Sequence, residues 1–237
     1  MKTNNFCLRT DAYKQTHWIQ YPKNTRYVYS YLESRGGEFH STLFFGLQYY
    51  LKKYLEGVVV NQQMIDEADI FCKKTFGQDY FNRKGWEHIL RVHGGRLPIR
   101  IKAVQEGTLV NERNVLMSIE NTDPEVPFIT NLVETILMKV WYPTSVATLS
   151  FMIKENIKYF ANITGEVVSP FHLNDFGFRG VSSVESAGIG GAAHLVNFQG
   201  TDTLEGIQYA MRYYGADVCG YSVMAAEHST VTSYGKE

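Results

Sequence analysis

Hydroxyl, carboxylate and imidazole side chains gather near the end of the chain. Ser222 and His228 lie in one segment of small and polar residues, and Asp202 precedes them. These three residue types could form a hydrolase triad, but such enzymes also carry a G-x-S-x-G turn, which the sequence around Ser222 lacks. The sequence therefore does not favour a triad. The small residues before His228 and the hydroxyls beside it are more typical of a loop than of a core face.

A second candidate is the run from Asp175 to Arg179, which reads Asp-Phe-Gly-Phe-Arg. Its first three residues match a kinase motif, but the kinase catalytic loop and lysine strand are absent. What remains is a tight turn after a strand, a place where α/β folds carry function. An aromatic ring beside an arginine could stack a flat ligand and hold a phosphate. Taken alone, however, the segment favours one core phenylalanine and one surface arginine.

The glycine-rich run 188–193 formally matches the dinucleotide fingerprint G-x-G-x-x-A. That motif needs a strand before it and an acidic residue about 20 positions later, at the end of a second strand. The preceding residues 181–187 make a poor strand with three serines, and Asp202 and Glu205 fall before or inside a helix. We therefore expect the small residues to allow close helix packing. The three cysteines are far apart and form no zinc-ligand spacing, so no metal ligand is predicted.

These candidates must be positioned by two regions of different character. Apolar spacing, caps and glycine stops predict a mixed α+β region over 1–145 and alternating strands and helices over 146–237, so the fold class is α/β. The second region is too short for a closed eight-unit barrel, so we expect it to be small and open or incomplete. The predicted strands are 26–32, 98–103, 115–119 and 171–176. The predicted helices are 43–54, 61–76, 86–92, 127–141, 144–162, 183–198 and 203–214, with Pro143 separating the fourth from the fifth.

Composition restricts the partners. Lys plus Arg is 23 and Asp plus Glu is 24, which leaves a formal net charge of −1. This balance argues against nucleic acid as a partner. No apolar run approaches the roughly 18 residues that a membrane helix needs, so no membrane association is expected. The first residues form no signal peptide and the cysteines fit a reducing compartment, which together predict a cytoplasmic protein.

Taken together, the candidate segments resemble the nicotinamide phosphoribosyltransferase family. The likeness is carried by TDAYKQTHWIQYPKNTRYVYSYLESR at 10–35 and FFGLQYYL at 44–51. It continues through NDFGFRGVSSVESAGIGGAAHLVNFQGTDT at 174–203 and GYSVMAAEHSTVTSYGKE at 220–237. The resemblance implies an N-terminal sheet domain followed by part of a type II phosphoribosyltransferase barrel. It also implies a homodimer with shared active sites, in the NAD salvage pathway.

In this family, nicotinamide reacts with phosphoribosyl pyrophosphate to give nicotinamide mononucleotide and pyrophosphate. Mg²⁺ accompanies the pyrophosphate, and ATP hydrolysis can be coupled through a phosphorylated histidine. Matched residue by residue, the likeness implies a set of roles for this chain. Phe176 and the partner subunit's Tyr13 would stack on nicotinamide, Asp202 would accept from its carboxamide, Arg179 would contact substrate, Arg35 would bind phosphate, His228 would accept phosphate from ATP, and Asp11, Ser222 and Val223 would line the pocket.

The resemblance covers only about the N-terminal half of the family's chain. Three explanations stay open: a piece of a longer enzyme, one half of a split enzyme, or a shortened protein with another task. We expect the 237 residues alone not to hold a complete site. Two alternative functions also stay open, a nicotinate-type phosphoribosyltransferase and a non-catalytic nicotinamide-binding protein. Asp202 argues against the first, because a carboxylate repels nicotinate.

Overall fold

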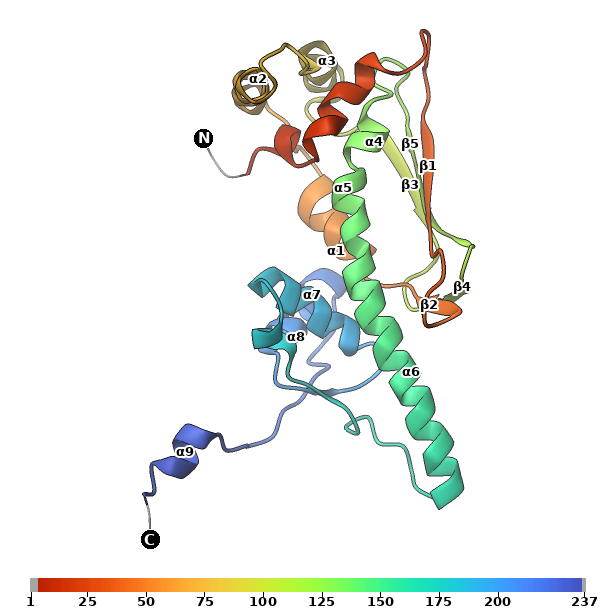
Figure 1. Ribbon diagram of the computed structural model, residues 1–237, viewed down its shortest axis with the longest axis vertical. Coiled ribbons are helices and arrows are strands. Elements are labelled where there is room, and N and C mark those ends of the chain that lie inside the picture. Colours follow the sequence, from red (N-terminus) through yellow and green to blue (C-terminus); the bar gives the residue numbers. More distant parts are fainter. Residues whose placement is uncertain (1–3, 236–237) are drawn as a thin grey trace. The chain divides into compact units, whose positions relative to one another are not determined.

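The computed structural model describes residues 4–235, and the chain divides into two compact units, 1–149 and 150–237. The sequence had placed this division at 145/146. The first unit contains a three-stranded antiparallel sheet in the order β1-β5-β3 (Figure 1). Its strands are β1 (Tyr29–Glu33), β3 (Ile99–Ala103) and β5 (Val115–Asn121), with Tyr31 opposite Ser118 and Ile101 opposite Ile119. The central strand β5 is mostly buried, and helix α4 (Ile129–Leu132) packs against the sheet.

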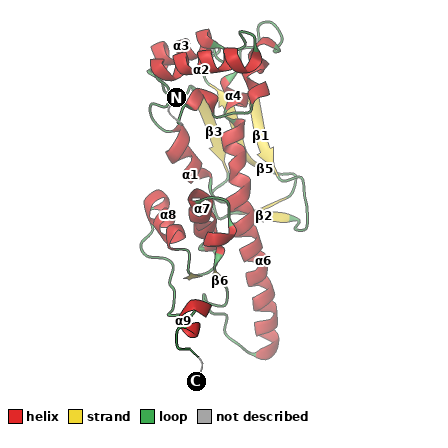
Figure 2. Cartoon of the chain, turned by 60° about the vertical axis from the view of Figure 1, so that its left-hand side comes forward, coloured by secondary structure: helices red, strands yellow, loops and turns green. Residues whose placement is uncertain are grey.

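Two helices that pack on each other follow their local signals closely (Figure 2). Helix α2 (Gln62–Phe76) begins after Asn61, whose side chain accepts a hydrogen bond from the Met64 amide, and ends at Gly77 with φ 65°. The predicted helix 61–76 is confirmed, because both ends are specified by residues beside them. Helix α3 (Arg83–His93) starts three residues earlier than predicted, with Asn82 as its cap, and ends at Gly94.

The other elements of the first unit are short. Strands β2 (Ser41–Leu43) and β4 (Leu109–Asn111) pair antiparallel, and neither was predicted. The predicted helix 43–54 is wrong at its start, where β2 ends, and becomes a turn of α-helix followed by a turn of π-helix. The remaining helices and turns of this unit are η1 (Phe6–Leu8), η2 (Ala12–Ile19), α1 (Leu47–Tyr50), η3 (Leu51–Leu55), α5 (Glu134–Leu137) and η4 (Met138–Val140).

Pro143 does not separate two helices, contrary to the prediction. Helix α6 runs continuously over Trp141–Thr164, and Pro143 lies in its first turn. A helix leaves its first amides without partners inside the helix, so proline costs little there.

The absence of an apolar stretch of membrane length is also contradicted. The helical stretch Ile129–Thr164 is long and apolar enough to cross a membrane, with a window of mean hydropathy 1.3 that is 44% buried. One such helix is weak evidence, because the core helix of a water-soluble protein passes the same test.

The second unit is built on parallel strands and a helix pair. Strand β6 (Asn174–Asp175) pairs with β7 (Gly200–Thr201), and Gly200 also bridges to Tyr221. The predicted strand 171–176 is therefore too long. The helices of this unit, besides the end of α6, are η5 (Gly177–Gly180), α7 (Val184–His194), α8 (Leu204–Tyr214) and α9 (His228–Thr232).

Helices α7 and α8 meet at glycines, as the small-residue interpretation predicts. A Cβ atom at Gly191 would lie 2.9 Å from the Cα of Gly206, and one at Gly188 would lie 2.5 Å from the ring of Tyr209. The glycine-rich run lies within helix α7 and follows no strand, so it is not a dinucleotide fingerprint. It is a helix-packing surface instead.

Candidate functional site

Three chain segments of the second unit run side by side and end at one edge. The Thr201 amide donates to the Tyr221 carbonyl over 2.9 Å, and the Asp202 amide donates to the Asp175 carbonyl over 2.8 Å. Because parallel segments present their carboxyl ends together, the residues that follow each of them meet at that edge. These residues are Phe176, Asp202 and Ser222.

The carboxylate of Asp202 is held there by two neighbours. Ser222 Oγ donates to its Oδ1 over 2.6 Å, and Asn174 Nδ2 donates to the same oxygen over 3.2 Å. Within residues 4–235, Oδ2 of Asp202 has no hydrogen-bond partner, and the residue is exposed. The Asp202 cluster, meaning Asn174, Asp202 and Ser222, therefore presents one carboxylate oxygen to a ligand that can donate a hydrogen bond.

The turn after β6 projects a ring and a guanidinium outward. Asp175 shapes the turn, because its Oδ1 accepts from the Gly177 amide over 2.8 Å. Phe176 is 65% exposed and Arg179 is exposed as well. Phe178 is also exposed, so the plainer sequence interpretation, with one phenylalanine in the core, is wrong. Exposed aromatic rings on a turn at a strand end are suited to stacking on a flat ligand.

A buried histidine contacts β7, and no sequence signal predicted this role. His194 Nε2 lies 3.0 Å from the Gly200 carbonyl and Nδ1 lies 3.0 Å from Ser150 Oγ, while the ring stacks on Phe198 at 5.5 Å. Burial lowers the pKa of His194, so the neutral ring is favoured. In the tautomer that satisfies both contacts, Nε2–H donates to Gly200 and Nδ1 accepts from Ser150. This residue fixes the strand that ends at Asp202.

The remaining predicted residues of this unit are exposed. His228 is the first residue of the one-turn helix α9, so it lies in a short helix where the sequence predicted a loop, and away from any core as expected. Val223 is also exposed. In the described part of the chain no hydrogen bond joins His228 to Ser222 or Asp202. Ser222 contacts Asp202 directly, which a hydrolase triad would not have, so that triad is not assembled.

Three predicted site residues belong to the first unit. Asp11 precedes η2 and accepts a hydrogen bond from Thr135 Oγ1 over 3.3 Å. Tyr13 is exposed, with Lys14 Nζ 5.3 Å from its ring centroid. Arg35 is exposed and lines a pocket of about 830 Å³ beside the end of β1.

Potential metal ligands meet elsewhere in the first unit. His88, His93 and Asp123 hold ligand atoms that all lie within 4.8 Å of one another. Burial alone would raise the pKa of Asp123, but hydrogen bonds from the Glu125 amide, His93 and His88 outweigh it and lower the pKa to about 2. The carboxylate is therefore ionised at neutral pH. The sequence did not predict this group, because the expected metal-ligand spacings involve cysteines. No local sequence pattern links His93 to Asp123.

Comparison with known proteins gives this geometry a context. Residues 5–101 match the family model described as nicotinamide phosphoribosyltransferase, N-terminal domain, and residues 171–237 match that of the nicotinate phosphoribosyltransferase (NAPRTase) family. A nicotinamide phosphoribosyltransferase of Xanthomonas campestris is 47% identical over 99% of this chain and 50% of its own length. One of Acinetobacter baylyi is 35% identical over 93% of this chain and 47% of its own length.

A solved structure carries the same fold. The crystal structure of human nicotinic acid phosphoribosyltransferase superposes with a TM-score of 0.65, at 19% identity, over 94% of this chain and 40% of that one. This likeness confirms the expected α/β fold class. The chain spans about half the length of the curated relatives it matches. Across nearly all its residues, the chain is similar to proteins named nicotinamide phosphoribosyltransferase.

Proposed function

We propose that this chain supplies the nicotinamide-binding part of a nicotinamide phosphoribosyltransferase. The reaction transfers phosphoribosyl from phosphoribosyl pyrophosphate to nicotinamide, giving nicotinamide mononucleotide and pyrophosphate. The observation that carries the proposal is the Asp202 cluster, whose free oxygen lies at the strand edge from which Phe176 also projects. The relatives' names supply the substrate class.

Nicotinamide offers a flat, electron-poor ring and a carboxamide NH₂. Phe176 would stack on the ring, and Oδ2 of Asp202 would accept from the NH₂. Hydrogen bonds from Ser222 and Asn174 to Oδ1 hold the carboxylate of Asp202 in place. An ionised Asp202 would repel the carboxylate of nicotinate, which explains a preference for the amide. Ser222 would act through its hydrogen bond to Asp202, by fixing the carboxylate that faces the ligand.

The reaction requires little proton transfer by the protein. The pyridine nitrogen attacks the anomeric carbon while pyrophosphate leaves, so catalysis rests on positioning and on charge neutralisation. Arg179 would neutralise phosphate beside the ring, and Arg35 would do so across a homodimer. Tyr13 of the partner subunit would cover the second face of nicotinamide. His228, exposed at the start of α9, would accept phosphate from ATP.

Mg²⁺ would arrive with the pyrophosphate. Both carboxylate oxygens of Asp175 already accept hydrogen bonds, from Gly177 and Thr201, and Asp202 has a single free oxygen. Since Mg²⁺ takes octahedral oxygen ligands, this edge does not form a dedicated magnesium site. We propose a cytoplasmic location, which the widely spaced cysteines favour, with neither nucleic acid nor a membrane as partner.

A nicotinate-type enzyme is the second candidate. It is favoured by the family match over 171–237, which includes Phe176, Asp202 and Ser222. The two candidates differ in the charge of the ligand that Asp202 faces. Binding of nicotinamide and of nicotinate to the same chain therefore separates them.

The test is ligand binding by the 237-residue chain, followed by NMR, and product formation with phosphoribosyl pyrophosphate and Mg²⁺. We expect nicotinamide to bind at least about tenfold more tightly than nicotinate, a difference of about 1.4 kcal/mol. Asp202→Asn should narrow that difference and Phe176→Ala should weaken both ligands. Asp217→Asn, at another exposed carboxylate of the second unit, serves as the control.

We expect turnover only when the carboxyl-terminal half of a relative is added as a second polypeptide. If ATP stimulates turnover by the parent but not by His228→Ala, the result would support the role of His228. Equal binding of both ligands by the parent, or unchanged selectivity in Asp202→Asn, would contradict the proposal. Absence of nicotinamide binding by a folded chain would contradict it as well.

A further inference from the structure

Two imidazoles of helix α3 converge on one carboxylate in the first unit. Nε2 of His88 lies 2.8 Å from Oδ2 of Asp123, and Nε2 of His93 lies 2.7 Å from the same oxygen. The two histidines are five positions apart, and Gly94 ends the helix directly after His93. Asp123 comes from the segment that follows β5. The group therefore joins two elements that are distant in sequence.

The carboxylate is aimed by its own surroundings. The Glu125 amide donates to Oδ1 of Asp123 over 2.9 Å, which leaves Oδ2 for the histidines. Asn121, only 1% exposed, donates to the Asp123 carbonyl over 2.8 Å and fixes the backbone. Such outer hydrogen bonds orient the ligands of metal sites and hold them in place before the ion arrives.

Burial and charge also fit a cation. The side chains of His88, His93 and Asp123 are 20%, 28% and 14% exposed, so solvent reaches the group without surrounding it. Two imidazole nitrogens and one carboxylate oxygen are a donor set that zinc and related divalent transition ions take in proteins. An ion could take the place of the hydrogen bonds between the carboxylate oxygen and the two imidazoles, with each ring carrying its proton on Nδ1 and presenting Nε2 to the ion.

The geometry requires a small adjustment for such an ion. Metal–ligand bonds of about 2.0–2.1 Å in a tetrahedron separate the ligand atoms by about 3.3 Å. The two nitrogen–oxygen distances would open by about 0.5–0.6 Å from their present 2.8 and 2.7 Å. Rotation of the imidazole rings supplies movements of this size without a change in the backbone.

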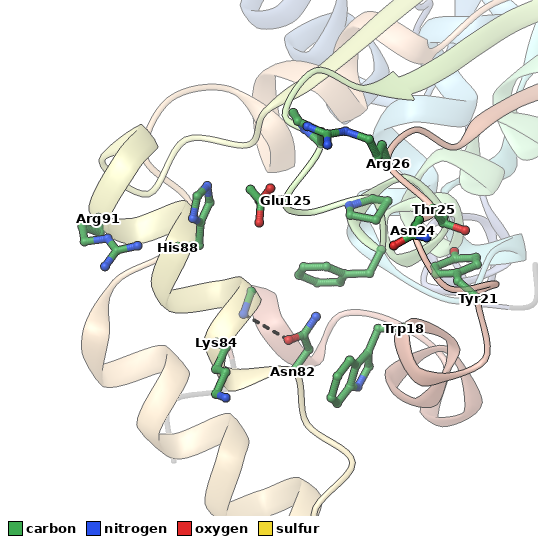
Figure 3. Close-up of a pocket in the computed structure, with 14 residues that line it drawn as sticks. Trp18, Tyr21, Asn24, Thr25, Arg26, Asn82, Lys84, His88, Arg91 and Glu125 are labelled. Carbon is green, nitrogen blue, oxygen red and sulfur yellow. Dashed lines mark hydrogen bonds between the residues drawn. The ribbon is translucent and has the colours of Figure 1, made fainter.

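A pocket of about 670 Å³ adjoins the group (Figure 3). His88 lines it together with Lys84, Arg91 and Arg26, and Glu125 is its acidic member. The cationic rim would attract an anion or a metal-bound hydroxide rather than a second cation. The fourth position of a metal held by His88 would thus have both room and an electrostatic preference.

We propose that His88, His93 and Asp123 form a binding site for a zinc-class divalent cation, with a fourth position open to water or a small anion. The site joins α3 to the segment after β5 and stabilises the first unit when occupied. It is separate from the nicotinamide proposal, which uses no residue of this group.

The test titrates the metal-stripped chain with Zn²⁺ against a chromophoric chelator and records the visible spectrum with Co²⁺. We expect one Zn²⁺ per chain, a tetrahedral Co²⁺ spectrum and a rise in the melting temperature. His88→Gln, His93→Gln and Asp123→Asn should each weaken Zn²⁺ binding by tenfold or more. His40→Gln is the matched control, because this histidine of the same unit is 92% exposed.

Cys219→Ser removes the half-exposed thiol as another source of zinc binding and should leave the stoichiometry unchanged. The three ligand variants are examined separately by circular dichroism, so that a fold defect in one leaves the others informative. Zinc affinity in His93→Gln and Asp123→Asn equal to that of the parent would overturn the proposal. So would stoichiometric binding that disappears only with Cys219→Ser, or no binding by the folded parent.

Discussion

The tightest contact between helices α7 and α8 offers a quantitative test of the second unit. Gly206 faces Gly191 with no side chain on either residue. A Cβ atom at Gly206 would lie 2.7 Å from the Gly191 carbonyl carbon, 2.8 Å from its Cα and 3.0 Å from the Ala192 nitrogen. All three are backbone atoms within α7, so no side-chain rotation can relieve the overlap. Gly206→Ala must therefore push the helices apart.

The size of the effect follows from these distances. Ordinary contact begins at 3.4 Å, so the shortfall is 3.4 − 2.7 = 0.7 Å. Overpacking of this kind costs about 1–3 kcal/mol. Alanine gains up to about 1 kcal/mol over glycine in a helix interior, which offsets part of the loss. We expect Gly206→Ala to lower the free energy of unfolding by about 1–2 kcal/mol. At about 2–4 °C per kcal/mol for a chain of this size, the melting temperature should fall by about 2–8 °C.

Thermal unfolding followed by circular dichroism measures the change. Gln208→Ala is the control, because Gln208 is exposed on the same helix, and it should stay within about 0.5 kcal/mol of the parent. Since α8 begins two residues after Asp202, nicotinamide binding should weaken in Gly206→Ala as well. A Gly206→Ala chain that melts at or above the parent temperature would refute the close contact, because helix propensity alone would then explain the result.

Three further changes test other parts of the fold by chemical denaturation. Asn61→Ala removes the acceptor for the Met64 amide and should cost about 1 kcal/mol, whereas no loss would mean that α2 is not capped there. Gly46→Ala should cost about 2 kcal/mol or more, because φ is 108° and a Cβ would lie 2.3 Å from Pro143 Cγ; a neutral result would contradict this backbone. Because the pKa of His194 is lowered in the folded chain, the unfolded chain takes up a proton at a higher pH. The free energy of unfolding should therefore be full above pH 6.5 and decrease as the pH falls below it. His194→Phe should flatten that slope, and an unchanged slope would assign it to another group.

Elements with local signals could be predicted from the sequence. Helix α2 has its cap and its glycine stop within one residue of its ends, and α8 ends at Gly215 as expected. Strands β2 and β4 could not be predicted, because each has three residues and exists through pairing such as Ser41 with Asn111. Pro143 misled the prediction, since proline at a first turn and proline as a break look alike in sequence.

In the candidate site, too, the residues could be predicted from the sequence but their tertiary contacts could not. The sequence singled out Phe176, Asp202 and Ser222 as polar or aromatic residues in loops, but not the contact of Ser222 with Asp202. It also placed one phenylalanine of the turn in the core, because apolar residues are usually buried and the segment alone holds no opposing sign. The support of β7 by His194 depends on tertiary packing, which no local pattern encodes.

Strand register brings the three segments that end at Asp175, Thr201 and Tyr221 together into one candidate site. Asp175 pairs with Thr201, and Thr201 bonds to Tyr221, so the next residue of each segment arrives at the same edge. Thr201 is fully buried and Asp202 is exposed, as expected from side chains that alternate between the two faces at the end of a strand. A shift of β7 by one residue would turn the Asp202 side chain inward and expose Thr201, and Ser222 would lose its acceptor. Under the proposed function, recognition of an amide would therefore depend on the two backbone hydrogen bonds as well as on the carboxylate itself.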